Sequence, residues 1–358
     1  MAFRIPSRAR WLAALTVAVC LSAGLRAAGP LPSRLTDAQF WQLITDSSEL
    51  NGTFRSDNLL SNEVAMQAVI PELMHATRSG RVYLGVGPEQ NYTYIAALKP
   101  AMAFIIDVRR GNLDLQLMYK ALFELSADRA EFVSRLFSRP RPAGLTTASS
   151  ASVVFTAFMP VAASEPLFRS NLQAVVDRLT RTHRFGLRAE DVSGIGDIYR
   201  AFFEFGPEIQ YSSTGRSGGR NQPTYADLMT ATDAGGEARS YLSTEDRFVF
   251  LKDLESRNML VPVVGNFGGP RAIRRVGAYV RAHGSTISAF YVSNVEQYLR
   301  MDGLWRTFCA NVGMLPLDQT SMFIRSVRGG QSGQPFGFGL TSELGSMVDE
   351  TRDCGPPQ

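Results

Sequence analysis

Residues 81–95 read RVYLGVGPEQNYTYI, and residues 103–107 read AFIID. The first apolar run ends in a Gly-x-Gly turn, a proline and a glutamate open a helix, and the second apolar run ends in Asp107. This order predicts a strand, a helix and a parallel strand with a ligand site at their tip. Asp107 lies twenty positions past Gly87, about the spacing at which such an acid reaches the hydroxyl groups of a ribose.

A second unit of this kind lies later in the chain. An apolar run at 260–264 predicts a buried strand, a glycine-rich turn follows at 265–269, and residues 286–292 predict the next strand. The two units together predict an α/β, Rossmann-like fold with a mostly parallel sheet and flanking helices. Open parallel sheets bind ligands at the carboxyl ends of their strands. The polar residues just past the last of these strands are Ser293, Asn294 and Glu296.

The region between the two units has a different pattern. A stretch with two prolines at 139–142 breaks a helix, the following segments have helical spacing, and residues 211–224 are rich in Gly, Ser and Arg, which is typical of a loop. The predicted organisation is a signal peptide at 1–28, the first half of the Rossmann-like domain at 29–137, a largely helical insertion or lid at 138–240, the second half at 241–328 and a flexible tail at 329–358.

The first 28 residues have the order of an export signal. Arginines at 4, 8 and 10 precede an apolar run, and small residues follow it, as in secretory leaders. The run of about fifteen residues is short for a membrane span, which needs roughly 20. We therefore expect a protein exported to the periplasm or the extracellular space, without a membrane span once the signal is removed. An uncleaved anchor is the alternative.

The charge balance does not support nucleic-acid binding. The chain has 37 basic and 33 acidic side chains, and four of the arginines lie in the predicted leader. The remaining chain is therefore near neutral, and it has no basic stripe. We expect a small-molecule ligand instead.

Two cysteines, Cys309 and Cys354, remain after the predicted leader. In an oxidising compartment they can pair and tie the tail to the body, which contributes about 3–4 kcal/mol in the chain-entropy model. Two unpaired thiols are the alternative. No group of His, Cys or acidic residues has the spacing of metal ligands, so we expect no metal site.

Local signals predict two helices ahead of the first strand. Thr36 and Gln39 have the form of a capping box. Ser61 can cap a helix that carries Val64 and Leu73. The polar run at 56–63, which contains Ser61 and Glu63, also lies where its side chains can reach the ligand tip.

The first glycine turn is a poor site for a pyrophosphate, which needs free N–H groups at a positive helix end. Pro88 lacks a donor, Glu89 adds a negative charge, and Gln90 stands where a dinucleotide fingerprint has its third glycine. The turn therefore favours a ligand with a ribose but no phosphate at this point. S-adenosylmethionine fits, because its sulfonium and ammonium groups are attracted to an acid.

These features resemble class I S-adenosylmethionine-dependent methyltransferases. The phrases GVGPEQN at 85–91, FIIDVRR at 104–110 and YVSNVEQY at 291–298 are similar to those of an uncharacterised bacterial family that shares this fold, and the likeness covers most of residues 36–327. The resemblance implies an S-adenosylmethionine site and a contact of Asn266 with a methyl acceptor. The cofactor-binding candidates are Gly85, Gly87, Glu89, Asn91 and Asp107, and the catalytic candidates are Asn266, Asn294 and Glu296.

The expected function is a methyltransferase-like protein that binds S-adenosylmethionine or a related nucleoside and transfers a methyl group. An exported, non-catalytic binding protein of the same fold is the alternative, because this cofactor is made and used in the cytoplasm. Asp107 likewise has an alternative role in an ion pair with Arg109 or Arg110. A serine hydrolase is a remote alternative: Ser217 lies in a Gly-x-Ser-x-Gly match, and Asp253 and His283 are downstream of it.

Overall fold

The computed structural model describes residues 29–211, 222–328 and 340–354. The expected signal peptide at 1–28 lies outside these residues. Within the three ranges, none of the helices combines the length and the apolar character needed to cross a membrane.

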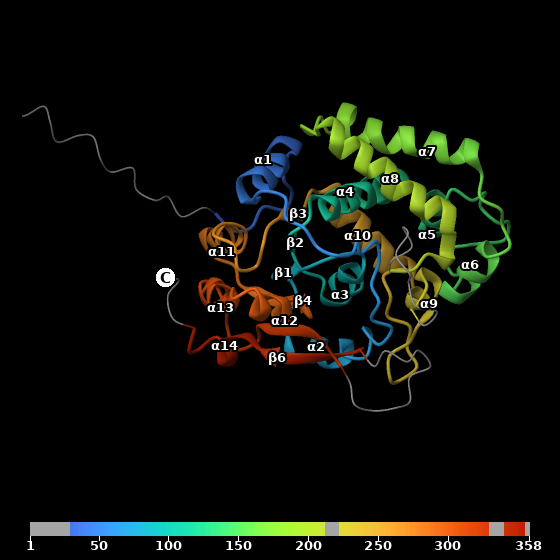
Figure 1. Ribbon diagram of the computed structural model, residues 1–358. Coiled ribbons are helices and arrows are strands. Elements are labelled where there is room, and N and C mark those ends of the chain that lie inside the picture. Colours follow the sequence, from blue (N-terminus) through green and yellow to red (C-terminus); the bar gives the residue numbers. More distant parts are fainter. Residues whose placement is uncertain (1–28, 212–221, 329–339, 355–358) are drawn as a thin grey trace, which may run out of the picture.

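A single sheet of six strands runs through the centre of the described chain (Figure 1). Its strands are β1 (Val82–Gly85), β2 (Met102–Asp107), β3 (Leu260–Val264), β4 (Ile287–Ser293), β5 (Met322–Arg328) and β6 (Leu340–Ser346). The order is β3-β2-β1-β4-β5-β6, and only β6 runs antiparallel to its neighbour. The predicted Rossmann-like α/β class is confirmed. The chain order reverses between β1 and β4, which is the switch point where such sheets bind ligands.

Helices cover both faces of the sheet, which is why β1, β2 and β3 are buried along their whole length and consist almost entirely of apolar residues. One layer contains α3 (Gln90–Leu98), α4 (Arg110–Leu125) and α10 (Glu245–Ser256). The other contains α1 (Asp37–Ser47), α11 (Ala272–Ala282) and α13 (Trp305–Gly313) (Figure 1). The core therefore lies in two layers, one on each side of β1, β2 and β4.

The two helices predicted ahead of β1 differ in outcome. Thr36 and Gln39 form the predicted capping box of α1. The second helix, α2 (Ile70–Ala76), is shorter than predicted and begins only at Ile70. Pro71 explains the difference, because proline fits the first turn of a helix but would remove a hydrogen bond from the interior of one that began near residue 64.

The predicted insertion is mostly helical. It contains α6 (Ala151–Phe158), α7 (Glu165–Asp177), the short π-helix η1 (Arg178–Thr182), α8 (Ala189–Phe205), η2 (Gly206–Glu208) and α9 (Tyr225–Thr230), and α5 (Arg129–Phe137) precedes it. Both α7 and α8 pack on α4 and extend that layer outward (Figure 1). Arg110, at the start of α4, makes two hydrogen bonds of 2.9 Å to the carboxylate of Asp191 in α8. This partly buried ion pair joins the insertion to the start of α4, directly after β2.

Part of the predicted flexible tail forms secondary structure, whereas its residues 329–339 and 355–358 lie outside the described residues. Residues 340–346 form β6, which pairs with β5 along its whole length, and α14 (Met347–Glu350) follows. A disulfide joins Cys309 in α13 to Cys354, so the predicted pairing is confirmed. Residues 341–346 of β6 read TSELGS, which is mostly polar. Because β6 is an edge strand, it does not need a continuous apolar run, and the sequence therefore does not predict a strand there.

Replacing Cys309 and Cys354 by serine should lower the free energy of unfolding by about 4 kcal/mol in the chain-entropy model, because the bridge joins residues 45 positions apart. Urea unfolding of the double variant and of oxidised wild type measures this difference. Intact mass after alkylation provides the control. Two thiols that react with the alkylating agent before any reduction would contradict the disulfide.

Candidate functional site

A cleft of about 930 Å³ opens at the carboxyl ends of β1 to β5. Gly87 follows β1, Asp107 ends β2, Asn266 follows β3, Ser293 ends β4 and Ser326 lies in β5; all five line the cleft. The volume is in the range of small-molecule sites, and the position is the one at which open parallel sheets bind ligands.

Gly85 leaves room for the side chain that shapes the turn after β1. A Cβ atom at this position would lie 1.8 Å from Oδ1 of Asn91. The Asn91 amide donates to the carbonyls of Val86 at 2.9 Å and Pro88 at 2.8 Å, and its Oδ1 accepts a hydrogen bond from the Tyr83 hydroxyl at 2.9 Å. Gly85 and Asn91, both predicted cofactor contacts, thus build the turn from behind and are not among the residues that line the cleft.

Gly87 and Glu89 lie on opposite sides of this turn. Gly87 has a left-handed φ of +79°, and no atom of the described residues outside its own turn lies within 4 Å of where its Cβ would be, so a ligand can approach its backbone closely. Glu89 is fully buried behind the turn, with Oε1 accepting a hydrogen bond from the Ser61 amide and Oε2 without a partner in the part of the chain that the structure describes. Burial raises the pKa of Glu89 to about 8. Its carboxyl is therefore largely protonated at pH 7 and does not bring the negative charge expected from the sequence.

Asp107 lines the cleft and forms the alternative ion pair with Arg109. Its Oδ1 accepts hydrogen bonds from the backbone amide and Nε of Arg109 at 2.9 and 3.1 Å, and its Oδ2 accepts one from Nη2 at 3.0 Å. Arg109 also donates to the carbonyls of Ser56 and Asp57. The pair therefore fixes the 56–57 loop at the cleft. Oδ2, with one hydrogen bond, keeps a lone pair for a ligand.

A carboxylate of the protein itself fills the second glycine turn. Glu49 accepts hydrogen bonds from the backbone amides of Asn266 at 3.2 Å, Arg271 at 2.8 Å and Ala272 at 2.9 Å. A Cβ on Gly269 would lie 2.3 Å from the same carboxylate. N–H groups at the start of a helix are the ones that would receive a phosphate, so this turn is closed to an anionic ligand.

The three catalytic candidates all line the cleft, but in different settings. Asn266 follows the edge strand β3, and its Oδ1 accepts a hydrogen bond from the Gly268 amide within its own turn. Glu296, in α12 (Val295–Met301), pairs with Arg325 at 2.8 and 3.0 Å. Asn294 follows β4 at the switch point, and its side chain has no hydrogen-bond partner in the described part of the chain.

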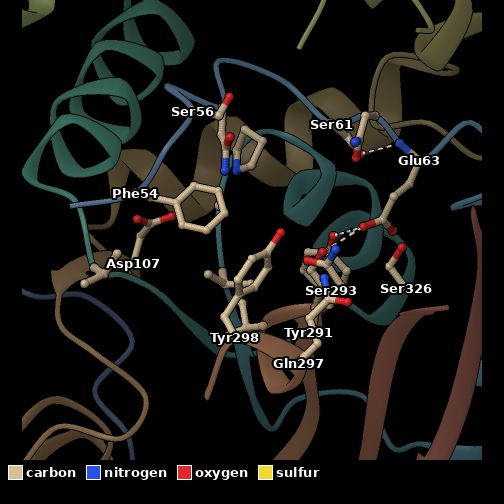
Figure 2. Close-up of a pocket in the computed structure, with 18 of the residues that line it drawn as sticks. Phe54, Ser56, Ser61, Glu63, Asp107, Tyr291, Ser293, Gln297, Tyr298 and Ser326 are labelled. Carbon is tan, nitrogen blue, oxygen red and sulfur yellow. Dashed lines mark hydrogen bonds between the residues drawn. The ribbon is translucent and has the colours of Figure 1, made fainter. Parts of the chain in front are cut away.

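One wall of the cleft, here called the Glu63 wall, consists of Glu63, Tyr291, Ser293 and Ser326 (Figure 2). Glu63 Oε1 accepts hydrogen bonds from the Tyr291 hydroxyl at 2.7 Å and the Ser293 hydroxyl at 2.9 Å, and Oε2 accepts one from the Gln90 amide at 2.8 Å. The sequence placed residues 56–63 near the tip but did not identify Glu63 as a buried carboxylate. Its partners on β4 are distant in the sequence, so only the fold brings them together.

The backbone at Ser293 is strained. Ser293 has a left-handed φ of +49°, which is uncommon for a residue other than glycine and is concentrated at functional sites. The pairing of β4 with β5 shifts register at the same point. In this conformation the Ser293 hydroxyl reaches Glu63, and the chain turns into α12 directly at the cleft.

An aromatic pair lies between Asp107 and the Glu63 wall in the view of Figure 2. The rings of Phe54 and Tyr298 meet edge to face with centroids 5.2 Å apart. Arg55 donates to the Tyr298 hydroxyl at 2.6 Å. The cleft thus combines aromatic surface with a polar wall, the composition typical of small-molecule sites.

The residues of the hydrolase alternative do not meet at this cleft. Ser217 lies outside the described residues. Asp253 pairs with Arg257 at the end of α10. His283 caps the end of α11, where its Nδ1 contacts the Tyr279 carbonyl at 2.8 Å. Each of these helices is followed directly by a strand. Both therefore end near the amino ends of the parallel strands, opposite the carboxyl ends where the cleft lies. Nor do the described residues contain a group of His, Cys, Asp and Glu able to hold a metal ion.

Comparison with known proteins gives one family. A family model described as "Domain of unknown function (DUF7790)" matches residues 59–151 and 218–346. No curated protein matches the chain. The matched ranges include all six strands and the Glu63 wall, and they leave out most of the helical insertion.

Replacing Gly85 by alanine should lower the free energy of unfolding by about 2 kcal/mol or more, because the new methyl group displaces Asn91 from its buried hydrogen bonds. Denaturant unfolding measures the change. Gly111→Ala is the control: it lies in the first turn of α4 with no atom near its Cβ position, so alanine should be neutral or slightly stabilising. Equal stabilities of Gly85→Ala and wild type would contradict the assigned role of Asn91.

Stability should fall as the pH rises from about 4.5 to about 8, because folded Glu89 keeps a proton that the unfolded chain loses in this window. Glu255 is buried with the same raised pKa and adds to the slope. Glu89→Gln should make the fall shallower, whereas Glu72→Gln, an exposed change in α2, should leave it as in wild type. Unfolding free energies at pH 5, 6.5 and 8 decide the matter, and an unchanged slope in Glu89→Gln would show that Glu89 is ionised when folded.

Proposed function

The chain belongs to the DUF7790 family, whose function is unknown, and we propose that it binds S-adenosylmethionine or a related nucleoside in the cleft and transfers a methyl group to an acceptor. The observation that carries this proposal is that Gly87 and Asp107 line one cleft, at the ends of neighbouring parallel strands beside the switch point. The open space at Gly87 admits a ligand to the backbone, and Asp107 offers a lone pair to a ribose hydroxyl.

The two glycine turns support a ligand without phosphate groups. Pro88 follows Gly87 and has no N–H to donate. The amides of the second turn are bonded to Glu49. A dinucleotide would find few free N–H groups for its pyrophosphate, whereas S-adenosylmethionine contains no phosphate group.

A binding protein without turnover is the second candidate. Two catalytic candidates favour it, because their side chains already interact within the protein. Glu296 pairs with Arg325, and Asn266 accepts a hydrogen bond from the Gly268 amide in its own turn. Formation of the demethylated product, S-adenosylhomocysteine, separates the two candidates.

S-adenosylmethionine and S-adenosylhomocysteine should stabilise the protein, by roughly 2.7 kcal/mol at about 100 times the dissociation constant. NAD at equal concentration should have a much smaller effect, because neither turn offers amides to its pyrophosphate. Thermal unfolding with each compound measures this, and stabilisation by NAD alone would overturn the proposal.

Phe54→Ala should weaken nucleoside binding by about 1–3 kcal/mol, the contribution of an aromatic ring stacked on a base. Phe205→Ala is the matched control, because Phe205 is 41% exposed at the end of α8 and does not line the cleft. Asp107→Asn should weaken binding by about 1.5–3 kcal/mol, and it should also destabilise the free protein because Arg109 loses its partner. Isothermal titration of the three variants gives the comparison, and equal affinities for all of them would remove Phe54 and Asp107 from the site.

A further inference from the structure

Glu63 is a buried carboxylate without a counter-ion. Its residue is 3% exposed, and its three hydrogen-bond donors, on Tyr291, Ser293 and Gln90, are all neutral groups. Burial, with the charge of Glu63 adding to it, raises the pKa of Tyr291 well above its usual value, so this phenol stays protonated and donates. No Lys or Arg of the described chain pairs with Glu63, although a buried charge is normally paired.

Ser326 provides a second, independent observation. Its residue is 6% exposed, its hydroxyl has no hydrogen-bond partner among the described residues, and it lines the cleft. Tyr291 pairs with Ile324 across β4 and β5, and side chains two positions apart share a face of a strand. Ser326 therefore lies on the same face of the sheet as Tyr291. Buried hydroxyls are normally hydrogen-bonded, and Ser326 differs from most other buried polar groups without a partner in the described chain because it lines the cleft, where a ligand can complete it.

We propose that the Glu63 wall binds a primary ammonium group and that the methyl acceptor of this protein is an alkylamine; the second part rests on the proposed function. A primary ammonium has three N–H donors and no acceptor. Glu63 Oε2 accepts a single hydrogen bond, neither the Ser326 hydroxyl nor the Asn294 side chain has a partner among the described residues, and all three residues line the cleft. A hydroxyl or carboxylate acceptor would leave the charge of Glu63 uncompensated.

The same wall provides for the proton that methylation of an amine releases. The bound ammonium first gives a proton to Glu63 Oε2 and becomes a neutral amine. The nitrogen lone pair then forms a bond to the methyl carbon of the sulfonium donor as the carbon–sulfur bond breaks. Sulfur leaves as a neutral thioether, the product is a methylammonium, and Glu63 returns its proton to water. Atoms and charges balance without a further reactant.

The test uses 2-phenylethylamine, whose apolar body suits Val295 and Tyr298 on the α12 side of the cleft. Isothermal titration should show binding at least about tenfold tighter than that of 2-phenylethanol, which lacks the charge, and of the trimethylated ammonium, which lacks N–H donors. Glu63→Gln should weaken amine binding at least about tenfold, and Ser326→Ala about two- to tenfold. Asp302→Asn removes an exposed charge at the rim and should change the affinity less than about twofold.

Ser326→Ala keeps the test valid if Glu63→Gln fails to fold, because the Ser326 hydroxyl makes no hydrogen bond with the described residues. Equal binding of the amine and the alcohol, or unchanged amine affinity in Ser326→Ala, would overturn the ammonium site. Amine binding that persists with S-adenosylhomocysteine present supports the acceptor assignment. Competition between them would place the ammonium end of the nucleoside on the wall and overturn it. Amine binding as expected without any nucleoside binding would refute the proposed function and leave the ammonium site standing.

Discussion

The position of the Asn91 side chain against Gly85 is the contact on which the geometry of the cleft depends. Three hydrogen bonds hold this side chain in the turn after β1. They set the direction in which Gly87 faces the cleft, and they fix the start of α3. The preceding residue, Gln90, donates a hydrogen bond to Glu63. One buried amide thus aligns both the glycine turn and the Glu63 wall.

The buried acids of this protein are accommodated in three ways. Glu89 and Glu255 are buried where their pKa values are about 8, so protonation neutralises them. Asp107 and Asp191 are matched by arginines. Glu63 has no arginine or lysine partner among the described residues, only neutral hydrogen-bond donors. A buried carboxylate normally has a charged partner, and Glu63 lies in the cleft, where a ligand can supply one.

The fold was predictable from the sequence because its signals are local. The apolar runs that end in Gly85 and Asp107, and the polar residues after β4, follow directly from strand burial and chain order. The direction in which a turn residue faces depends on the tertiary structure around it and not on the neighbouring sequence. For this reason the sequence predicted that Asn91 and Glu89 contact the ligand, although they lie behind the turn. The bond between Ser293 and Glu63 joins residues 230 positions apart, and the polar edge strand β6 gave no apolar signal; only tertiary packing determines either.

The sheet topology also has a kinetic consequence. β1 is central, yet its second neighbour, β4, is made only after the whole insertion: the bond from Ser288 to Val82 spans 206 positions. During synthesis the apolar edge of β1 therefore stays open until most of the chain exists. Closing such a long loop costs conformational entropy before any stabilising contact between the strands has formed. The sheet is therefore expected to assemble slowly, and its ligand cleft is expected to be among the last features to form.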